Sequence, residues 1–227
     1  MIDILQKYFS RQRSIEKNAI LKYRSDNTTC VIKDNVFLYN VKLHMYVTLL
    51  ENASLQDTTI DSYSYVGQRS ILKNVSLGRF CSLGPDLKIG LASHPLGNFV
   101  STYPAFYSPS NEGCAIQMRS DKIFKDEIKK TIIGHDVWLG ASVIIPGGIK
   151  IATGSVIAAG SVVVKDVEPY SVNGGNPARF IRYRFPQTII EKLIQSKWWE
   201  WPLSMIKENI DRYSNIDEFI EYLDSLT

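Results

Sequence analysis

The chain lacks several features that would place it in a familiar class. Its three cysteines, Cys30, Cys81 and Cys114, form an odd set with no CxxC pair and no metal-ligand spacing, which argues against a disulfide framework or a zinc finger. No run of 18 apolar residues occurs, so no membrane-spanning helix is predicted. The net charge of +3 over 227 residues is too small to indicate nucleic acid or a membrane surface as a partner.

Common catalytic motifs are also missing. The sequence has no Walker loop, no serine nucleophile elbow and no GxGxxG segment after a predicted strand,. The first residues are too polar for a secretory signal, so we expect the protein to stay in the cytoplasm. The length and the hydrophobic share of 44% fit one large domain, or one domain with a small appendage.

What the chain does have is a strict spacing of six between bulky aliphatic residues. One series is Ile133, Leu139, Ile145, Ile151, Ile157 and Val163, and a second, four places later, is Val137, Val143, Ile149, Ser155, Ser161 and Val167. Neither an α-helix, with period 3.6, nor a simple strand, with period 2, requires a period of six. A coil with three flat faces does require it, with one hexad per face and successive turns stacked about 4.8 Å apart.

An earlier tract keeps the same spacing. It consists of Ile71, Leu77, Leu83 and Ile89, followed at plus four by Val75, Cys81, Leu87 and Ser93. Cys81 therefore reads as a small core residue. Residues 31–70 alternate only loosely and predict irregular first coils, and a tightened corner near 69–73 would absorb one missing residue.

These patterns predict three regions. Residues 1–30 form an N-terminal segment compatible with a short helix over 2–9. Residues 31–185 form the coiled domain, with a long loop inserted at 91–130, where the spacing stops; loops of this length are usually functional or disordered. Residues 186–227 form a helical extension, in which Asn215 and Glu218 make a capping pair for the last helix.

Of the three histidines, His94 has the most suggestive place, because it lies where the coil gives way to the inserted loop. A neutral imidazole there could act as a general base toward a hydroxyl. The competing interpretation is a surface histidine held by a backbone carbonyl. His135 is expected to be a solvent-facing turn residue, and His44 carries little signal. The three positions are too far apart in the sequence to favour a zinc site.

Small residues dominate the predicted corners. The set Gly134, Gly140, Gly147, Gly148, Gly154 and Gly160 is expected at corners that need positive φ, while Ala141 and Ala159 would let a ligand lie flat. Lys165 fits either a phosphate contact or a solvated surface charge. Trp138 puts a large indole outside the coil and needs something to pack against. The Trp198–Trp201 cluster is expected to anchor the terminal helices.

Together, several segments resemble the hexapeptide-repeat acyltransferases, in particular the xenobiotic acetyltransferase-like group related to CatB. The segments are GRFCSLGPDLKIGLASHP, STYPAFYS, TIIGHDVWLGASVIIPGGIKI, SVIAAGSVVVKDVEPYSVNGGNPA and KWWEWP, spread over about residues 66 to 210. The resemblance implies an all-β, left-handed parallel β-helix, assembled as a homotrimer with active sites between subunits. It also implies direct acetyl transfer from acetyl-CoA to a hydroxyl, without a metal and without an acyl-enzyme.

The resemblance also implies roles for individual residues. His94 matches the catalytic histidine, and Trp138 matches a tryptophan at the acyl end of the coenzyme. The remaining coenzyme positions are Ala141, Ala159, Gly160, Lys165, Asn176, Pro177 and Arg179. Tyr103 and Phe106 fall beside the acceptor, and Tyr103 stands where many relatives have histidine, a change we expect to affect acceptor binding only.

The acceptor is less constrained. The long loop and the N-terminal extension favour a saccharide, such as a precursor of a surface polysaccharide. The alternative acceptor is a xenobiotic such as a streptogramin or chloramphenicol. A different class of function, a non-catalytic coil that binds a partner, stays open, as does an acyl donor longer than acetyl.

Overall fold

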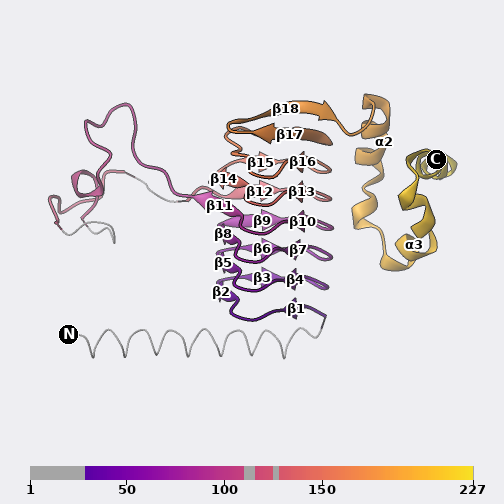
Figure 1. Ribbon diagram of the computed structural model, residues 1–227, viewed down its shortest axis with the longest axis horizontal. Coiled ribbons are helices and arrows are strands. Elements are labelled where there is room, and N and C mark those ends of the chain that lie inside the picture. Colours follow the sequence, from indigo (N-terminus) through magenta and orange to yellow (C-terminus); the bar gives the residue numbers. More distant parts are fainter. Residues whose placement is uncertain (1–28, 110–115, 125–127, 227) are drawn as a thin grey trace.

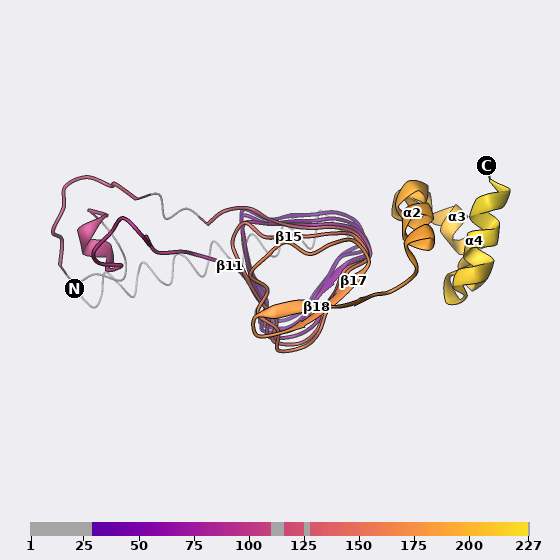
Figure 2. The same ribbon diagram turned by 90° about the horizontal axis from the view of Figure 1, so that it is seen from above.

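The structure is a computed structural model that describes residues 29–109, 116–124 and 128–226. The chain winds into a left-handed parallel β-helix whose coils stack in one direction (Figure 1). Viewed from above, the coils form a triangle (Figure 2), as the hexad spacing predicts. The short helix predicted over 2–9 lies outside the described residues.

Each side of the triangle is a sheet of short strands, one from each coil. Sheet A contains β1 (Val31–Ile32), β4 (Thr48–Leu49), β7 (Tyr65–Val66), β10 (Ser82–Leu83), β13 (Trp138–Leu139), β16 (Val156–Ile157), β17 (Ser171–Gly175) and β18 (Ala178–Tyr183). Sheet B contains β2 (Phe37–Tyr39), β5 (Ser54–Gln56), β8 (Ile71–Lys73), β11 (Lys88–Leu91) and β14 (Ile144–Pro146). Sheet C contains β3 (Lys42–Leu43), β6 (Thr59–Ile60), β9 (Val75–Leu77), β12 (Thr131–Ile133) and β15 (Lys150–Ile151).

The hexad residues fill the core of the upper coils. In the series from Ile133 to Val163, no side chain is more than 2% exposed. Of the second series only Ile149 is partly exposed. Burial of one such aliphatic side chain contributes about 1.5–3 kcal/mol, so this stack of side chains is the main source of stability of the coil.

The lower coils are regular, and the prediction of irregular first coils is wrong. Corresponding inward residues Leu38, Leu55 and Leu72 follow one another at 17 residues, and all are buried. In each lower coil one side of the triangle has five residues in place of six. In the third of these coils, for example, only five positions separate the inward residues Leu72 and Leu77. The prediction of an inward Ile71 is also wrong, since its side chain is 37% exposed.

The shortened corner follows sheet B. Asn40, Asp57 and Asn74 occupy it in successive coils with φ of 50°, 48° and 51°. Asparagine and aspartate tolerate this left-handed conformation better than other side chains. The expected tightened corner near 69–73 therefore lies one residue beyond that range, at Asn74.

The corner glycines have two different roles. Gly148, Gly154 and Gly160 have positive φ, as predicted, but Gly134, Gly140 and Gly147 do not. At Gly140 a Cβ would lie 2.5 Å from the backbone nitrogen of Ala159, so the stacked backbone of the next coil excludes a side chain there.

The inserted loop leaves the coil after β11 and returns at β12. It projects away from the triangle beyond the corner where β11 ends (Figures 1 and 2). At its base, Gly147 N–H donates to the Leu91 carbonyl over 3.1 Å, and the Asn74 side chain donates to the Ile128 carbonyl over 2.7 Å.

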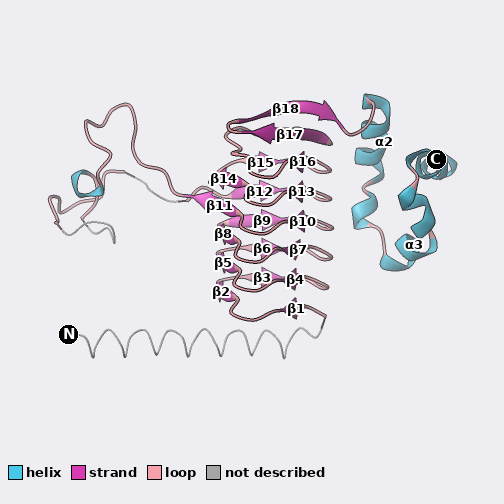
Figure 3. Cartoon of the chain, in the orientation of Figure 1, coloured by secondary structure: helices cyan, strands magenta, loops and turns pink. Residues whose placement is uncertain are grey.

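The coil ends in an antiparallel hairpin of β17 and β18, and helices follow (Figure 3). They are α2 (Gln187–Ser196), α3 (Leu203–Glu208) and α4 (Ile216–Ser225), with the 3-10 turns η2 (Trp198–Glu200) and η3 (Ile210–Ser214). The predicted cap is confirmed: the Asn215 side chain accepts from the N–H groups of Asp217 and Glu218.

Aromatic stacking joins the helices to the coil. Tyr46, Tyr63 and Phe80 lie in successive coils, and their rings stack with centroids 5.3 and 4.7 Å apart. Trp198 lies 5.3 Å beyond Phe80. The tryptophan cluster therefore anchors the terminal helices, as expected.

His135 belongs to the same contact, and the prediction that it faces solvent is wrong. Its ring stacks on Trp199 at 5.2 Å with an interplanar angle of 10°. Its Nδ1 accepts from the Arg79 N–H over 3.0 Å. Burial lowers the pKa of His135 below its usual value,.

Candidate active site

His94 lies on the inserted loop, three residues after β11 ends. Its side chain is exposed, and its Nδ1 lies 3.0 Å from the Thr102 carbonyl oxygen. A carbonyl oxygen can only accept, so Nδ1 carries the proton and Nε2 keeps a lone pair. That tautomer leaves an exposed nitrogen able to take a proton from a hydroxyl.

A small aromatic core supports His94 within the loop. Tyr107 is 1% exposed, and its ring packs edge-on against Phe124 at 5.4 Å and Phe99 at 6.3 Å. Its hydroxyl lies 3.0 Å from His94 Nδ1. Tyr107 could not be recognised as a site residue from the sequence, because the motif STYPAFYS does not show which of its rings turns toward His94.

Tyr103 and Phe106 lie on the outside of the same loop. They flank and end the 3-10 turn η1 (Pro104–Phe106), and they are 42% and 48% exposed. The turn itself is anchored by buried Pro104 and Ala105. The loop therefore displays two aromatic faces a short way along the chain from His94.

A second group of predicted residues lies on the coil. It occupies strand β13 of sheet A and the corner regions that follow β13 and β16. Trp138 is 55% exposed on the outer face of β13. Ala159 and Gly160 are exposed and Ala141 is half-buried, and Gly160 N–H donates to the Ala141 carbonyl over 2.8 Å. A Cβ on Gly160 would meet no atom within 4 Å, so this corner presents a smooth, open backbone.

The remaining predicted residues lie at the end of the coil. Lys165 and Arg179 line one cavity of about 480 Å³ between the last coil and β18. Tyr183 closes part of it and donates to Glu168 over 2.5 Å. Asn176 and Pro177 lie in the exposed turn between β17 and β18.

One chain does not bring these two groups together. The loop with His94 extends from the corner after β11, whereas Ala141, Ala159 and Gly160 occupy the corner after sheet A (Figures 1 and 2). In a single chain the two groups therefore belong to different corners of the triangle.

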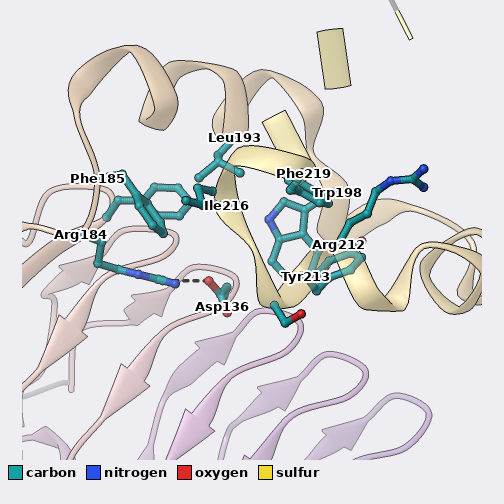
Figure 4. A pocket seen from close by; sticks show the side chains of 11 residues that line it. Asp136, Arg184, Phe185, Leu193, Trp198, Arg212, Tyr213, Ile216 and Phe219 are labelled. Carbon is teal, nitrogen blue, oxygen red and sulfur yellow. Dashed lines mark hydrogen bonds and ion pairs between the residues drawn. The ribbon is translucent and has the colours of Figure 1, made fainter. Parts of the chain in front are cut away.

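A further cavity, of about 410 Å³, lies between the end of the coil and the terminal helices (Figure 4). Arg184 donates to Asp136 over 2.9 Å and to the Gly154 carbonyl over 2.7 Å. Burial raises the pKa of Asp136 above its usual value, and Arg184 partly opposes this. None of the predicted site residues lines this cavity.

The cysteines offer no accessible nucleophile in the described part of the chain. Cys81 is 1% exposed, and burial raises its pKa to about 12. Cys30 is half-buried and donates to the His44 carbonyl over 3.0 Å. Among residues 29–109, 116–124 and 128–226, no group of three or more His, Cys, Asp or Glu side chains is placed to hold a metal ion.

Within the same described ranges, no helix is long and apolar enough to cross a bilayer.

Comparison with known proteins identifies related chains. The family described as bacterial transferase hexapeptide (six repeats) matches residues 130–165. A chloramphenicol acetyltransferase of Escherichia coli is 40% identical over 62% of this chain, and the match spans slightly under two thirds (66%) of that relative.

Two further relatives differ in the acceptor that they are named for. A virginiamycin A acetyltransferase of Staphylococcus aureus is 33% identical over 87% of this chain and 88% of its own length. A galactoside O-acetyltransferase of Escherichia coli K12 is 27% identical over 64% of this chain and 56% of its own.

Proposed function

Because the chain belongs to the hexapeptide-repeat acyltransferases related to CatB, we propose that it transfers an acetyl group from acetyl-CoA to a hydroxyl. The observation that carries the proposal is His94, an exposed imidazole whose Nδ1 is held by the Thr102 carbonyl at 3.0 Å. Acetyl-CoA is a cytoplasmic metabolite, so the proposed reaction takes place in the cytoplasm.

The proposed mechanism is a direct transfer. Nε2 of His94 removes the proton of the acceptor hydroxyl as its oxygen attacks the thioester carbonyl. When the carbon–sulfur bond breaks, the coenzyme A sulfur takes that proton back from the imidazolium. Backbone N–H groups of the coil would stabilise the oxyanion, which contributes about 10²-fold or more per donor. Buried Cys81 is not available to form an acyl-enzyme.

The smooth corner of the coil is the proposed coenzyme site. The pantetheine arm would lie along Ala141, Ala159 and Gly160, whose small side chains leave room for it, with Trp138 at the acyl end. The charges of Lys165 and Arg179, beside Asn176 and Pro177 at the end of the coil, suit the coenzyme phosphates.

We also propose a homotrimer in which the loop of one copy reaches the coil corner of the next. Two features support it: the loop extends away from its own coil (Figure 2), and it exposes large apolar side chains. Leu96 is 81% exposed, and Val100 is fully exposed. Covering such side chains favours association of copies.

A saccharide is the acceptor we propose. Tyr103 and Phe106 offer exposed aromatic faces near His94, and flat rings of this kind can pack against the apolar faces of sugar rings. A second candidate is an antibiotic, which the names of the relatives at 33% and 40% identity favour.

The test is a measurement of thiol release from acetyl-CoA with a panel of nucleotide sugars, glycans and antibiotics. We expect turnover with a sugar, and a loss of about 10²–10⁴-fold in His94→Gln. His44→Gln is the matched control, because His44 is a partly exposed histidine on a lower coil.

Two results would contradict the proposal. Wild-type turnover in folded His94→Gln would rule out the base, and failure of the trimer to bind acetyl-CoA would favour a non-catalytic coil. Turnover with antibiotics alone would replace the saccharide by the second candidate.

A further inference from the structure

The Nδ1 atom of His94 faces two oxygen atoms, not one. The Thr102 carbonyl and the Tyr107 hydroxyl each lie 3.0 Å from it. The carbonyl can only accept, which fixes the proton on Nδ1. Beside an Nδ1–H group the Tyr107 oxygen accepts as well. Because a hydroxyl can also donate, the carbonyl alone selects the tautomer, and the Tyr107 oxygen adds a second contact that fixes the position of the ring.

The position of the Tyr107 hydroxyl is set by packing and by backbone hydrogen bonds. The Tyr107 ring lies in the core of the loop with Phe99 and Phe124, and it meets the His94 ring edge-on at 6.4 Å and 80°. The Tyr107 N–H donates to the Pro104 carbonyl over 3.0 Å, and its carbonyl accepts from the Ile123 N–H over 2.9 Å. A fully buried ring fixed in this way has little freedom to turn.

His94 itself is exposed and has no such packing in the coil. A histidine on a loop with a single hydrogen bond can rotate about χ1 and χ2, and rotation would move Nε2 away from the substrate. Small displacements of a catalytic group reduce the rate strongly. The Thr102 carbonyl restricts the tautomer, and the two oxygens together restrict the orientation of the ring.

We infer that Tyr107 is a positioning residue, which holds the ring of His94 so that Nε2 is directed at the acceptor hydroxyl. The inference rests on the proposed function, because it assigns a task to a residue that acts through the base. Tyr107 does not touch the substrate in this scheme.

The first experiment compares Tyr107→Phe with the wild-type enzyme. This variant keeps the ring and removes only the oxygen. We expect kcat to fall about tenfold, as expected for one lost hydrogen bond of about 1.4 kcal/mol, while KM for acetyl-CoA and for the acceptor stays unchanged. Tyr39→Phe is the control, because Tyr39 is an exposed tyrosine on the lower coil β2.

The second experiment records nitrogen-15 spectra of the histidine rings, with the His94 signals assigned by their loss in His94→Gln. We expect a protonated Nδ1 and an unprotonated Nε2 in the wild type and in Tyr107→Phe, because the Thr102 carbonyl remains in both,. The Nδ1 signal should shift in the variant, which has lost one of the two oxygen partners of this atom. A purely structural role would lower the melting temperature of Tyr107→Phe without shifting the Nδ1 signal.

The outcomes separate the inference from the proposed function. If His94→Gln is inactive but Tyr107→Phe keeps the wild-type kcat or the wild-type Nδ1 signal, the positioning role is wrong and the base assignment stands. If folded His94→Gln stays active, the proposed function itself fails. Should Tyr107→Phe not fold, the wild-type spectrum alone decides, because a proton on Nε2 overturns the inference.

Discussion

At the scale of single residues, the stacking of His135 on Trp199 gives stability a dependence on pH. The folded chain holds this imidazole neutral, since burial lowers its pKa. Asp61 and Glu200 act against this shift, and Arg79 adds to it. The unfolded chain takes up a proton near the usual value of 6.5, so below that pH the unfolded state binds more protons than the folded one.

We therefore predict that the free energy of unfolding decreases as the pH falls from about 6.5 toward the lower folded pKa of His135, by at most about 1.4 kcal/mol per pH unit. Urea titrations of wild type and His135→Gln at several pH values measure this slope. The variant is expected to flatten it. Asp136 has the opposite effect, because its pKa in the folded chain is raised above the usual value of 3.8. The free energy of unfolding that it contributes therefore increases as the pH falls through the raised pKa toward 3.8,. An unchanged slope in His135→Gln would contradict the assignment.

At the scale of the coil, several corners require a left-handed backbone conformation. Asn52 follows sheet A at a corner with φ of 60°, and its side chain is exposed. A β-branched residue in this conformation is strained, whereas glycine adopts it freely.

We predict that Asn52→Val lowers the free energy of unfolding by about 1–2 kcal/mol. Asn52→Gly, the matched control, should change it by less than about 0.5 kcal/mol. Chemical denaturation of both variants is the measurement. Equal losses in the two variants would show that the side chain of Asn52, not its backbone conformation, matters.

The coils show what sequence patterns can and cannot predict. Six-residue spacing from Ile133 onward predicted the triangular coil and its core, because bulky side chains at fixed positions must point inward. In the lower coils one turn takes 17 residues, so a strict spacing of six residues does not continue from one turn to the next. The repeats Leu38, Leu55, Leu72 and Tyr46, Tyr63, Phe80 carry that signal.

The site was predictable only in part. His94 stood out at the end of a regular tract, and the small residues of the coil corner follow from the repeat. The role of Tyr107 depends on how the loop folds on itself, where no repeat fixes which side chains face each other. His135 was misjudged because its partner, Trp199, is more than sixty residues away in the sequence.

At the scale of the whole molecule, the separation of loop and coil corner predicts that two inactive variants can complement each other. His94→Gln has an intact coil, and Ala159→Trp has an intact loop but an indole in the proposed coenzyme path. In a mixed trimer, the intact loop of an Ala159→Trp copy can meet the intact coil corner of a His94→Gln copy.

Co-expression of the two variants with different tags, followed by purification of mixed trimers, tests this. Every mixed trimer, whichever variant it holds twice, has one of its three sites built from both intact halves, so we expect about a third of the wild-type rate. Each variant alone should be inactive. Mixed trimers without activity would indicate that each site is built from a single chain.

The self-contained core of the inserted loop has a consequence for how such proteins diversify. Tyr107, Phe99 and Phe124 hold His94 using contacts from the loop itself, while the coil corner owes its shape to the repeat. If Tyr103 and Phe106 on the outer rim of the loop contact the acceptor as proposed, they can therefore mutate and accommodate new acceptors without disturbing either the imidazole or the proposed coenzyme path. Selection can act on one part of the machinery while the others are inherited intact.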